Sequence, residues 1–357
     1  MAPRLPRIDS RDVAAAAGVS QATVSRALRN DPNIATKTRQ HVEEVARLLH
    51  YVPNELGRNL KNQATGRIAF VADLDNPLWP LLVARGHDEL MKRGYGMTLL
   101  AEHGDPTEMA ANLASGGVDG VIIGSAKLQA HLPGQLSQKG IPFVLVNRTI
   151  EGVEADASVA DNFGGGEAAA KLLISAGHRR IGAMFGPLET STGRDRESGF
   201  RAGMAHGGLS LPKSRVRHGA FDYAYGSEAL PTLLGGRFPP TAIFCSNDII
   251  AIGAINMAYR LGLRIPDDIA LMGFDDLEQA SWPVFGLTTI KVPFDDMLHT
   301  AIDVLLKRLG GEHSEPQVCV HPVVPVLRVT HQLVSEPSPK TVTRLRGTPT
   351  SIISHDN

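Results

Sequence analysis

From Arg67 onward the chain alternates short apolar runs, rich in β-branched residues, with longer amphipathic stretches. Parallel strands covered by helices on both faces have this texture, because every side chain of such a strand is buried. The expected strands are Arg67–Ala72, Met97–Ala101, Gly120–Ile123, Phe143–Val146, Ile181–Phe185, Ala242–Cys245 and Ile269–Met272. The expected helices between them include Leu81–Arg93, Gly165–Ala176, Gly193–His206 and Ile249–Leu261. One doubly wound sheet needs fewer units, so the pattern predicts two lobes, with the cleft between them as the default ligand site.

The first 50 residues have a different, wholly helical pattern. Val13 and Ala17 give an apolar face to a short helix, and Gly18 suits a tight turn into a second helix. Inward-facing positions of that second helix are Val24, Ala27 and Leu28. Its outer face then carries Gln21, Ala22, Ser25, Arg26 and Arg29. Such a face can meet phosphates and base edges in the major groove, although short helix pairs are also common as surface hairpins.

Capping residues delimit the remaining helices of this region. Asp9 or Ser10 can cap the first helix, and Thr36 can cap a third that runs to about Leu49. Asn54 can cap one further short helix, Glu55–Lys61, which is marginal alone because it has fewer than two turns and contains Gly57. The polar segment 62–66 follows as a link to the rest of the chain.

Charge divides the chain in the same way. The 357 residues carry a net charge of −1, yet residues 1–66 hold ten Lys and Arg against six Asp and Glu. A basic end on an acidic body favours nucleic-acid binding by that end, although an excess of this size could arise by chance. Cys245 and Cys319 lie in apolar strand-like runs, where thiols behave as small buried hydrophobes. Neither a signal peptide nor an apolar run of membrane-spanning length is evident, so we expect a cytoplasmic protein.

Ordered motifs extend over nearly the whole chain. The N-terminal helical region and the segment after it contain DVAxxAGVSxxTVSRxL at 12–28 and YxPNxxxRxLK at 51–61. The part of the chain after Arg67 contains NPLW at 76–79 and VADNFGGG at 159–166. GHRRI at 177–181, SND at 246–248, RIPDDIALMGFDD at 264–276 and LTTI at 287–290 follow. In these motifs the sequence resembles the LacI/GalR (lactose-repressor) family of bacterial transcription regulators.

The resemblance implies a small all-α helix-turn-helix head, residues 1–52, and a hinge helix with linker, residues 53–66. Residues 67–335 would form an α/β two-lobed core like that of periplasmic binding proteins, with two doubly wound parallel sheets. Lobe one is expected at about 67–162 and 291–322, and lobe two at about 163–290 and 323–335. Residues 336–357, rich in Ser, Thr and Pro, are expected to be disordered. Family members act as homodimers or tetramers, and the chain shows no heptad run for a tetramer tail.

The resemblance also assigns DNA contacts to individual residues. Base-reading positions of the head are Gln21, Ala22 and Arg26, of which Arg26 suits a two-pronged hydrogen bond to guanine. Positions that hold the DNA backbone are Thr23, Ser25 and Asn30. Thr23 and Ser25 could instead cap the helix locally or be solvated.

In the hinge, Leu60 matches the leucine that family members wedge between base steps in the minor groove. Its neighbours Arg58, Asn59 and Lys61 are the expected groove or phosphate partners. The alternative for Leu60 is packing on its own core. Gly57 and Ser10 depart from the family pattern, which prefers alanine and a large apolar residue there. We therefore expect a hinge that folds only on operator DNA.

A further set of residues is expected to line the effector cleft. On lobe one these are Leu78, Trp79, Asn147 and Arg148. On lobe two they are Thr192, Arg196, Phe221, Asn247 and Asp275, with Phe294 as a weaker candidate near a crossover. Aromatic faces stack on the C–H side of a sugar ring, and Arg, Asn and Asp fix its hydroxyls. The competing interpretations are core packing for Trp79 and Phe221, and a structural ion pair for Arg196 and Asp275.

These expectations define a DNA-binding repressor of pseudo-palindromic operators, switched by a sugar or sugar acid bound between the lobes. The alternatives are a regulator that needs a purine-type co-repressor and a small-molecule-binding protein with a vestigial head. We expect no cofactor, metal site or catalytic residues, since zinc, nucleophile-elbow and nucleotide-binding patterns are lacking. The run Gly164–Gly166 is expected to form a tight turn rather than a phosphate loop.

Overall fold

A computed structural model describes residues 8–28, 30–51, 64–102, 105–115 and 117–332 of the chain. The chain forms two compact units, residues 1–66 and 67–357, which are described separately. The expected hinge helix Glu55–Lys61 and the expected disordered tail lie outside the described residues. No helix among the described residues combines the length and apolarity that crossing a membrane requires.

Three helices make up the head: α1 (Ser10–Ala17), α2 (Gln21–Ala27) and α3 (Thr36–Leu48). Asp9 caps α1 as expected, since its carboxylate accepts the Arg11 and Asp12 N–H groups while Asp12 accepts the Asp9 N–H at 2.7 Å. Gly18 closes α1 with φ of +64°, a conformation that glycine adopts without strain. The predicted turn between α1 and α2 is therefore confirmed.

The head's apolar residues meet in one small core. Its members Val13, Val24, Ala27 and Val42 are almost entirely buried, and Leu28 is half-buried beside them. The predicted cap of α3 is wrong, because the helix already includes Thr36 and the preceding Ala35 has no side-chain group that could accept a hydrogen bond. The apolar spacing located α3 correctly but did not resolve which residue begins it.

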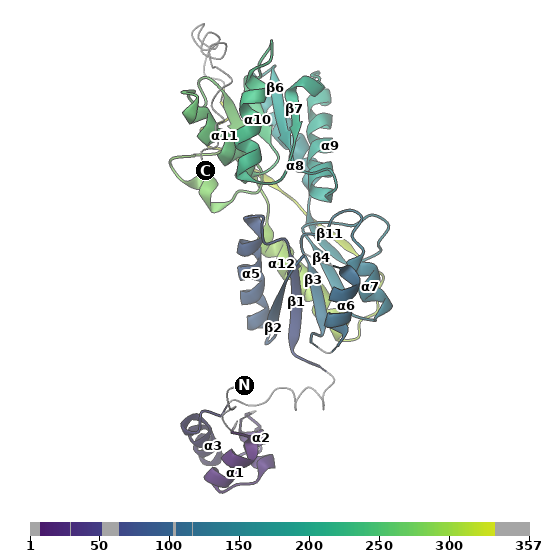
Figure 1. The fold of residues 1–357 in the computed structure, drawn as a ribbon, viewed down its shortest axis with the longest axis vertical. Helices are drawn as coiled ribbons and strands as arrows, with labels where there is room; N and C mark the ends of the chain where they lie inside the picture. The colour runs from purple at the N-terminus through teal and green to yellow at the C-terminus, as the bar shows by residue number, and fades with distance from the viewer. Residues whose placement is uncertain (1–7, 29, 52–63, 103–104, 116, 333–357) are drawn as a thin grey trace, which may run out of the picture. The chain divides into compact units, whose positions relative to one another are not determined.

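The first lobe of the core is built on a six-stranded parallel sheet in the order β11-β5-β4-β3-β1-β2. These strands are β1 (Arg67–Ala72), β2 (Gly96–Ala101), β3 (Gly120–Ile123), β4 (Phe143–Val146), β5 (Ala157–Ala160) and β11 (Val318–His321). Helices α5 (Leu78–Lys92) and α12 (Phe294–Leu309) cover one face of the sheet, and α6 (Pro106–Ala114) and α7 (Leu132–Gln138) cover the other (Figure 1).

Alternate residues of the central strands serve the two faces. Ile68 and Phe70 pack in the cluster with α5 and α12, whereas Ala69 and Val71 pack in the cluster with α6 and α7. All four side chains are fully buried. This double burial is why the strands are apolar at every position, as the sequence indicated.

The second lobe repeats the plan with a four-stranded parallel sheet in the order β7-β6-β8-β9. Its strands are β6 (Ile181–Phe185), β7 (Val216–His218), β8 (Ala242–Cys245) and β9 (Ala270–Met272). Its helices are α8 (Asn162–Ser175), α9 (Ser191–His206), α10 (Tyr223–Leu234) and α11 (Asp248–Arg260). Short 3-10 helices η1 (Lys213–Arg215) and η2 (Glu278–Ser281) and the antiparallel pair β10 (Thr289–Lys291) and β12 (Val324–Val326) complete the core. The predicted fold class is confirmed.

All four helices predicted in the core begin one to three residues earlier than expected. Polar caps explain this for three of them. Asp161 accepts the Gly164 N–H at 2.8 Å at the start of α8, Thr190 caps α9, and Asn247 caps α11. The sequence assigns Asn247 to the effector cleft and no role to Asp161 or Thr190, because a capping role depends on the backbone conformation before the helix.

The glycine run Gly164–Gly166 does not form the expected tight turn, because it lies in the first turn of α8. A Cβ on Gly166 would come within 2.3 Å of the Arg196 carbonyl oxygen in α9, and one on Gly199 within 1.9 Å of the Phe163 carbonyl oxygen. The glycines therefore allow two helix backbones to approach closely. This contact fixes the position of Arg196.

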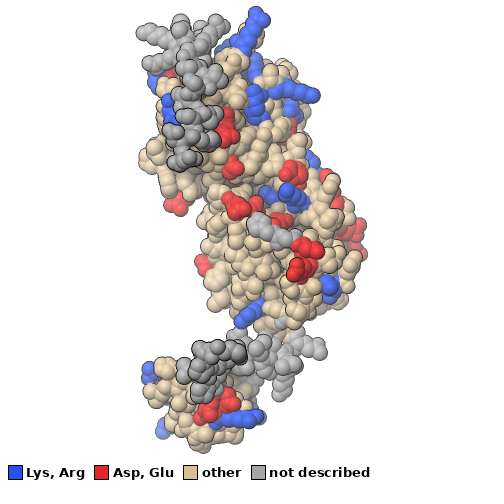
Figure 2. Space-filling model, in the orientation of Figure 1, with Lys and Arg blue, Asp and Glu red and all other residues tan. Residues whose placement is uncertain are grey.

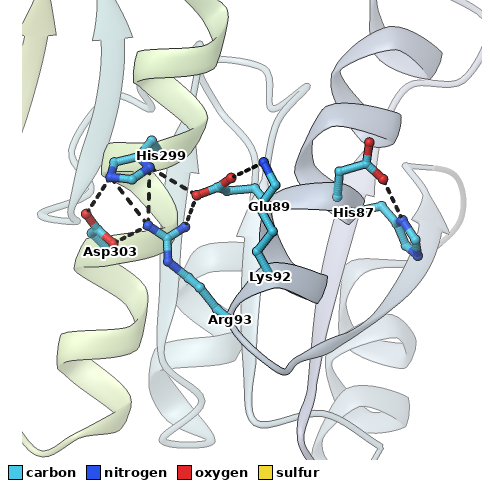
Figure 3. A network of polar contacts seen from close by, with 7 residues as sticks. His87, Glu89, Lys92, Arg93, His299 and Asp303 are labelled. Atoms are coloured by element: carbon cyan, nitrogen blue, oxygen red, sulfur yellow. Dashed lines mark hydrogen bonds and ion pairs between the residues drawn. The ribbon is translucent and has the colours of Figure 1, made fainter.

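Helices α5 and α12 are joined by a polar network at their surface (Figure 3). The Arg93 guanidinium pairs with Glu89 at 2.5 Å and with Asp303 of α12 at 2.6 Å. His299 of α12 lies 3.0 Å from the same Glu89 carboxylate through Nδ1. Glu89 and Arg93 are about one-fifth exposed and their α12 partners Asp303 and His299 about half exposed, so the network links α5 to α12 at a partly solvated surface.

The α8–α9 contact generates a stability prediction. Gly166→Ala should lower the free energy of unfolding by about 1–3 kcal/mol, because the added methyl group forces the two backbones apart. The matched control is Gly134→Ala in α7, where an added Cβ would have nothing within 4 Å and removal of a helical glycine should be neutral or stabilising. Urea unfolding of the full chain measures both, and equal midpoints would contradict the close-contact argument.

Candidate functional site

One candidate surface is the outer face of α2 in the head. Gln21, Ala22, Ser25 and Arg26 are exposed, as expected, while Val24 and Ala27 are buried against the other two helices. Arg26 has no ion-pair partner within the part of the chain that the structure describes. Asn30 is exposed with φ of +56° just beyond the helix. This face can present one cation and one amide to a DNA groove.

Two polar contacts order the start of this face. The Gln21 Nε2 donates to the Ser10 hydroxyl of α1 at 2.7 Å, so the residue that departs from the family pattern orients a predicted base-reading side chain. Ser20 caps α2 by accepting the Thr23 N–H at 3.1 Å, and the two hydroxyls lie 2.9 Å apart. The capping residue of α2 is therefore Ser20, and the Thr23 hydroxyl has a local partner in it. The hinge candidates Arg58, Asn59, Leu60 and Lys61 lie outside the described residues.

The second candidate site lies where the strand ends of the two lobes meet. Asn147 and Arg148 follow β4 of lobe one, and Ser246 and Asn247 follow β8 of lobe two. Asp275 lies three residues beyond the end of β9, also in lobe two. In open parallel sheets, ligands bind outside the carboxyl ends of the strands, where neighbouring connections diverge to opposite faces. Both sheets of this core offer such an edge.

Arg196 and Asp275 form the most buried ion pair of this region, with exposed fractions of 3% and 2% for their side chains. Arg196 Nη2 donates to Asp275 Oδ1 at 2.8 Å, Nε donates to Asn162 Oδ1 at 2.8 Å, and Nη1 donates to the Ser246 carbonyl oxygen at 2.6 Å. The guanidinium also lies over the Phe274 ring, 3.9 Å from its centroid. Burial raises the pKa of the Asp275 carboxyl, and the nearby Arg196 and Arg148 charges act in the opposite direction.

On the lobe-one side, Arg148 and Trp79 lie together. Trp79 is fully buried at the start of α5 against Gly124, and its ring centroid is 6.0 Å from the Arg148 guanidinium carbon. Arg148 donates one hydrogen bond to the Ser125 carbonyl oxygen. Burial lowers the pKa of Arg148 to about 10, although Glu102 and Asp73 favour its charged form. Asn147 stands beside it with φ of +71°.

The other predicted cleft residues are packed within the lobes. Leu78 belongs to the core of lobe one, and Phe294, at the start of α12, belongs to the same cluster. Phe221 packs against Gly186 in lobe two. The Thr192 hydroxyl donates to Thr190 at 3.3 Å, and the Asn247 side-chain carbonyl oxygen accepts the Ile250 N–H at 2.8 Å. Each of these side chains therefore has a structural role in this conformation.

Several buried polar atoms at the strand ends have no hydrogen-bond partner among the described residues. They are Trp79 Nε1, Asn147 Oδ1, Arg148 Nε and Ser246 Oγ. An unpaired buried polar group costs about 1–3 kcal/mol, so folded chains rarely contain several in one region. Three of the four belong to residues that the sequence placed in the effector cleft. A ligand or bound water at this place could form hydrogen bonds with these atoms and so remove the cost of burying them unpaired.

A cavity of about 970 Å³ opens at the carboxyl edge of the lobe-one sheet. Of the predicted residues, Arg148 alone lines it. Sequence reasoning missed its other polar residues, among them Asp73, Glu102, Ser125 and Glu189. Asp73, Glu102 and Ser125 follow the ends of β1, β2 and β3 within two residues. Residues at such positions lie at the ligand-binding edge of a parallel sheet, so the predicted strand ends could have identified them as candidates.

Contacts across the junction hold the two lobes together. The Leu128 N–H donates to the Glu189 carbonyl oxygen at 2.7 Å, and the Thr149 N–H donates to the Ser191 hydroxyl at 2.9 Å. Arg194 of α9 pairs with Glu151 at 2.7 Å. The structure therefore has the lobes in mutual contact, with the Arg196–Asp275 pair enclosed.

Comparisons with known proteins match both units. Residues 11–54 match the profile of bacterial regulatory proteins of the lacI family, and residues 170–330 match that of a periplasmic binding protein-like domain. The HTH-type transcriptional repressor PurR of Yersinia enterocolitica is 33% identical over 319 residues, which cover 87% of this chain and 94% of that relative. The PurR of Klebsiella pneumoniae shows the same identity and coverage.

Solved structures of transcription regulators are similar to this chain over most of its length. A lac repressor dimer bound to operator and an anti-inducer has a TM-score of 0.81 at 25% identity and covers 92% of this chain and 100% of that one. The complex of the transcriptional regulator CelR with cellobiose has a TM-score of 0.70 at 29% identity, with 91% and 100% covered.

Fold and site together define a regulator with a DNA-binding helix-turn-helix head and a two-lobed ligand-binding core. The chain belongs to the lacI family of bacterial regulatory proteins. The family interpretation of the sequence is thereby confirmed.

The buried ion pair generates a second stability prediction. Arg196→Met and Asp275→Asn should each lower the free energy of unfolding by about 3–5 kcal/mol, because each leaves an uncompensated buried charge. The double variant should lose much less than the sum of the two. Glu44→Gln, which breaks the exposed pair with Arg47 in α3, is the control and should barely move the urea midpoint. Additive losses would show that the two charges do not interact.

Proposed function

We propose that this protein is a transcriptional repressor that binds a pseudo-palindromic operator as a homodimer. A small carbohydrate bound at the junction of the lobes changes its operator affinity. The observation that carries the proposal is the set of polar atoms at the strand ends that have no partner among the described residues, on the same chain as an exposed α2 face.

The head supports DNA binding by its shape and chemistry. Arg26 is an exposed cation on the helix that enters the major groove in helix-turn-helix proteins, and Gln21 precedes it by five residues on that helix. The lac repressor neighbour is seen on its operator, and the PurR relatives are described as repressors. Gln21, Ala22 and Arg26 would read bases, while Thr23, Ser25 and Asn30 would hold the DNA backbone.

The core supports a hydroxyl-rich ligand. Within the described part of the chain, Arg148 Nε, Asn147 Oδ1 and Ser246 Oγ lack hydrogen-bond partners, and Trp79 lies beside Arg148 with an indole N–H that is likewise unpaired there. CelR, a structural neighbour, is seen in complex with cellobiose. Of the packed candidates, Leu78, Thr192, Phe221 and Asn247 would reach a ligand only if the lobes move apart.

A ligand can alter DNA binding only through a difference in its affinity for two lobe arrangements. The contacts of Leu128, Thr149 and Glu151 with lobe two define one such arrangement. A ligand that favours it would act on the operator complex through the hinge. An inducer loosens that complex and a co-repressor, as in the purine-type alternative, tightens it.

Arg26 tests the DNA-binding face. Arg26→Ala should weaken specific operator binding by about 5–150-fold, because a two-pronged contact to one base pair is worth about 1–3 kcal/mol. The matched control is Arg47→Ala, which removes an exposed cation that is already paired with Glu44 in α3. Gel shifts at several salt concentrations, on duplexes obtained by selection from random DNA, measure both. If the full chain selects no duplex, the head is vestigial.

Leu60 and Arg148 separate the two activities. Leu60→Ala should weaken operator binding far more than ligand binding, since it removes a wedge in the DNA and no group of the core. Equal losses of DNA binding and ligand binding in this variant would mean misfolding.

Arg148→Met should abolish the ligand response and leave DNA binding in place, because it removes the guanidinium that lines the cavity with an Nε unpaired among the described residues. Titration of DNA and of sugars against both variants measures this. A surviving response in the Arg148 variant would place the ligand elsewhere. Chemical conversion of a bound sugar would favour an enzyme.

A further inference from the structure

We infer that the cavity of lobe one selects its ligand by charge: it takes an uncharged or amine-bearing polyhydroxyl compound and rejects carboxylates and phosphates. This inference rests on the proposed function and narrows the effector class. It separates neutral and amino sugars from the sugar acids that the sequence left open.

The first observation is the charge of the cavity wall. Among the described residues, its wall contains the carboxylates Asp73, Asp75, Glu102, Glu151 and Glu189 and the two cations Lys127 and Arg148. Some of this charge is compensated locally, because Glu151 pairs with Arg194 at 2.7 Å and Glu189 lies 3.7 Å from Lys127. Of the other three carboxylates, Asp73 and Glu102 are the two that act on the Arg148 charge. Acidic and basic side chains are interspersed in the middle of the core, where the lobes meet (Figure 2).

The second observation points to a ligand directly. Arg148 lines the cavity with an exposed fraction of 7%, and its Nε has no partner among the described residues. Glu102, Asp73 and Glu189 favour its charged form and the Arg196 cation opposes it, so the guanidinium already has three carboxylates around it. An anionic ligand beside Arg148 would share the space with those carboxylates. A ligand hydroxyl could instead accept a hydrogen bond from Arg148 without adding negative charge.

The carboxylates suit the same ligand. The Ser125 hydroxyl donates to Glu102, and Asp73 accepts the Asp75 N–H at 3.1 Å, which leaves further acceptor sites on both groups. Ionised carboxylates only accept hydrogen bonds, so their natural partners are hydroxyl and ammonium groups. Apolar side chains such as Met109, Leu128, Leu132 and Leu188 supply surface for C–H faces. The volume of about 970 Å³ lies at the upper end of small-molecule sites and admits an oligosaccharide.

The test is a panel of matched sugars measured with the full chain. Each parent sugar (glucose, galactose, ribose and cellobiose) is compared with its amine, carboxylate and phosphate derivatives by thermal shift and calorimetry. We expect stabilisation by uncharged or amine-bearing members alone. Anionic counterparts of any binder should be at least about 50-fold weaker, as expected for a negative charge placed beside the Asp73 and Glu102 carboxylates. An acid or phosphate that binds as tightly overturns the inference, as does a panel in which no uncharged or amine-bearing member binds.

Variants that remove only charge sharpen the test. In Asp73→Asn/Glu102→Gln both hydrogen-bond acceptors remain, so the discrimination against anionic counterparts should shrink by about tenfold or more and amine binding should weaken. Glu228→Gln, an exposed position of α10 outside the cavity wall, is the matched control and should keep the wild-type pattern. Unchanged discrimination in the double variant overturns the assignment to this cavity.

Gel shifts with each binder separate this inference from the proposed function. An anionic binder that changes operator affinity would overturn the charge rule and leave the switch intact. An uncharged binder that leaves operator affinity unchanged would overturn the switch and leave the charge rule intact.

Discussion

The enclosed pair of Arg196 and Asp275 is the interaction on which the core depends. Its guanidinium joins α9, the start of α8, the end of β8 and the loop after β9 through hydrogen bonds to three different groups. A buried charge needs such complete hydrogen bonding, because desolvation would otherwise outweigh its ion pair. Close approach of α8 and α9 at Gly166 and Gly199 makes that geometry possible. The packing of small residues in one lobe thus sets the electrostatics of the junction.

Arg148 shows the opposite condition on the facing lobe. It is as deeply buried, yet it donates to one backbone carbonyl and its Nε is unpaired among the described residues. The sequence predicts Arg148 and Arg196 in one binding site, but their different hydrogen bonding indicates different roles. An arginine with all three guanidinium nitrogens hydrogen-bonded, such as Arg196, stabilises its lobe, whereas one with an unpaired nitrogen beside a cavity is suited to a ligand. In the proposed charge selection, the carboxylates around Arg148 determine which ligands are accepted.

Much of this could be predicted from sequence. The strands around Phe70, Ile122 and Phe244 were found because burial on both faces makes them apolar throughout, and Gly18 marked the turn of the head because it needs positive φ. Local backbone detail could not be predicted. Thr36 is in a helix that it was expected to cap, and Gly164–Gly166 are helical because α9 packs on them. The roles of Asn247 as a helix cap and of Phe221 as a packed side chain likewise depend on the folded backbone around them.

By itself the sequence determined the class of fold, the helix-turn-helix face and the family, because hydrophobic period, turn residues and ordered motifs are local properties of a chain. Tertiary structure alone decided which of the cleft candidates remain open to a ligand. Asp73, Glu102 and Arg148 share a cavity since three parallel strands end at one edge, while Arg196 and Asp275 are closed off by mutual pairing. Spacing along the chain does not encode either outcome, because both arise from the register of strands and helices that meet only after folding.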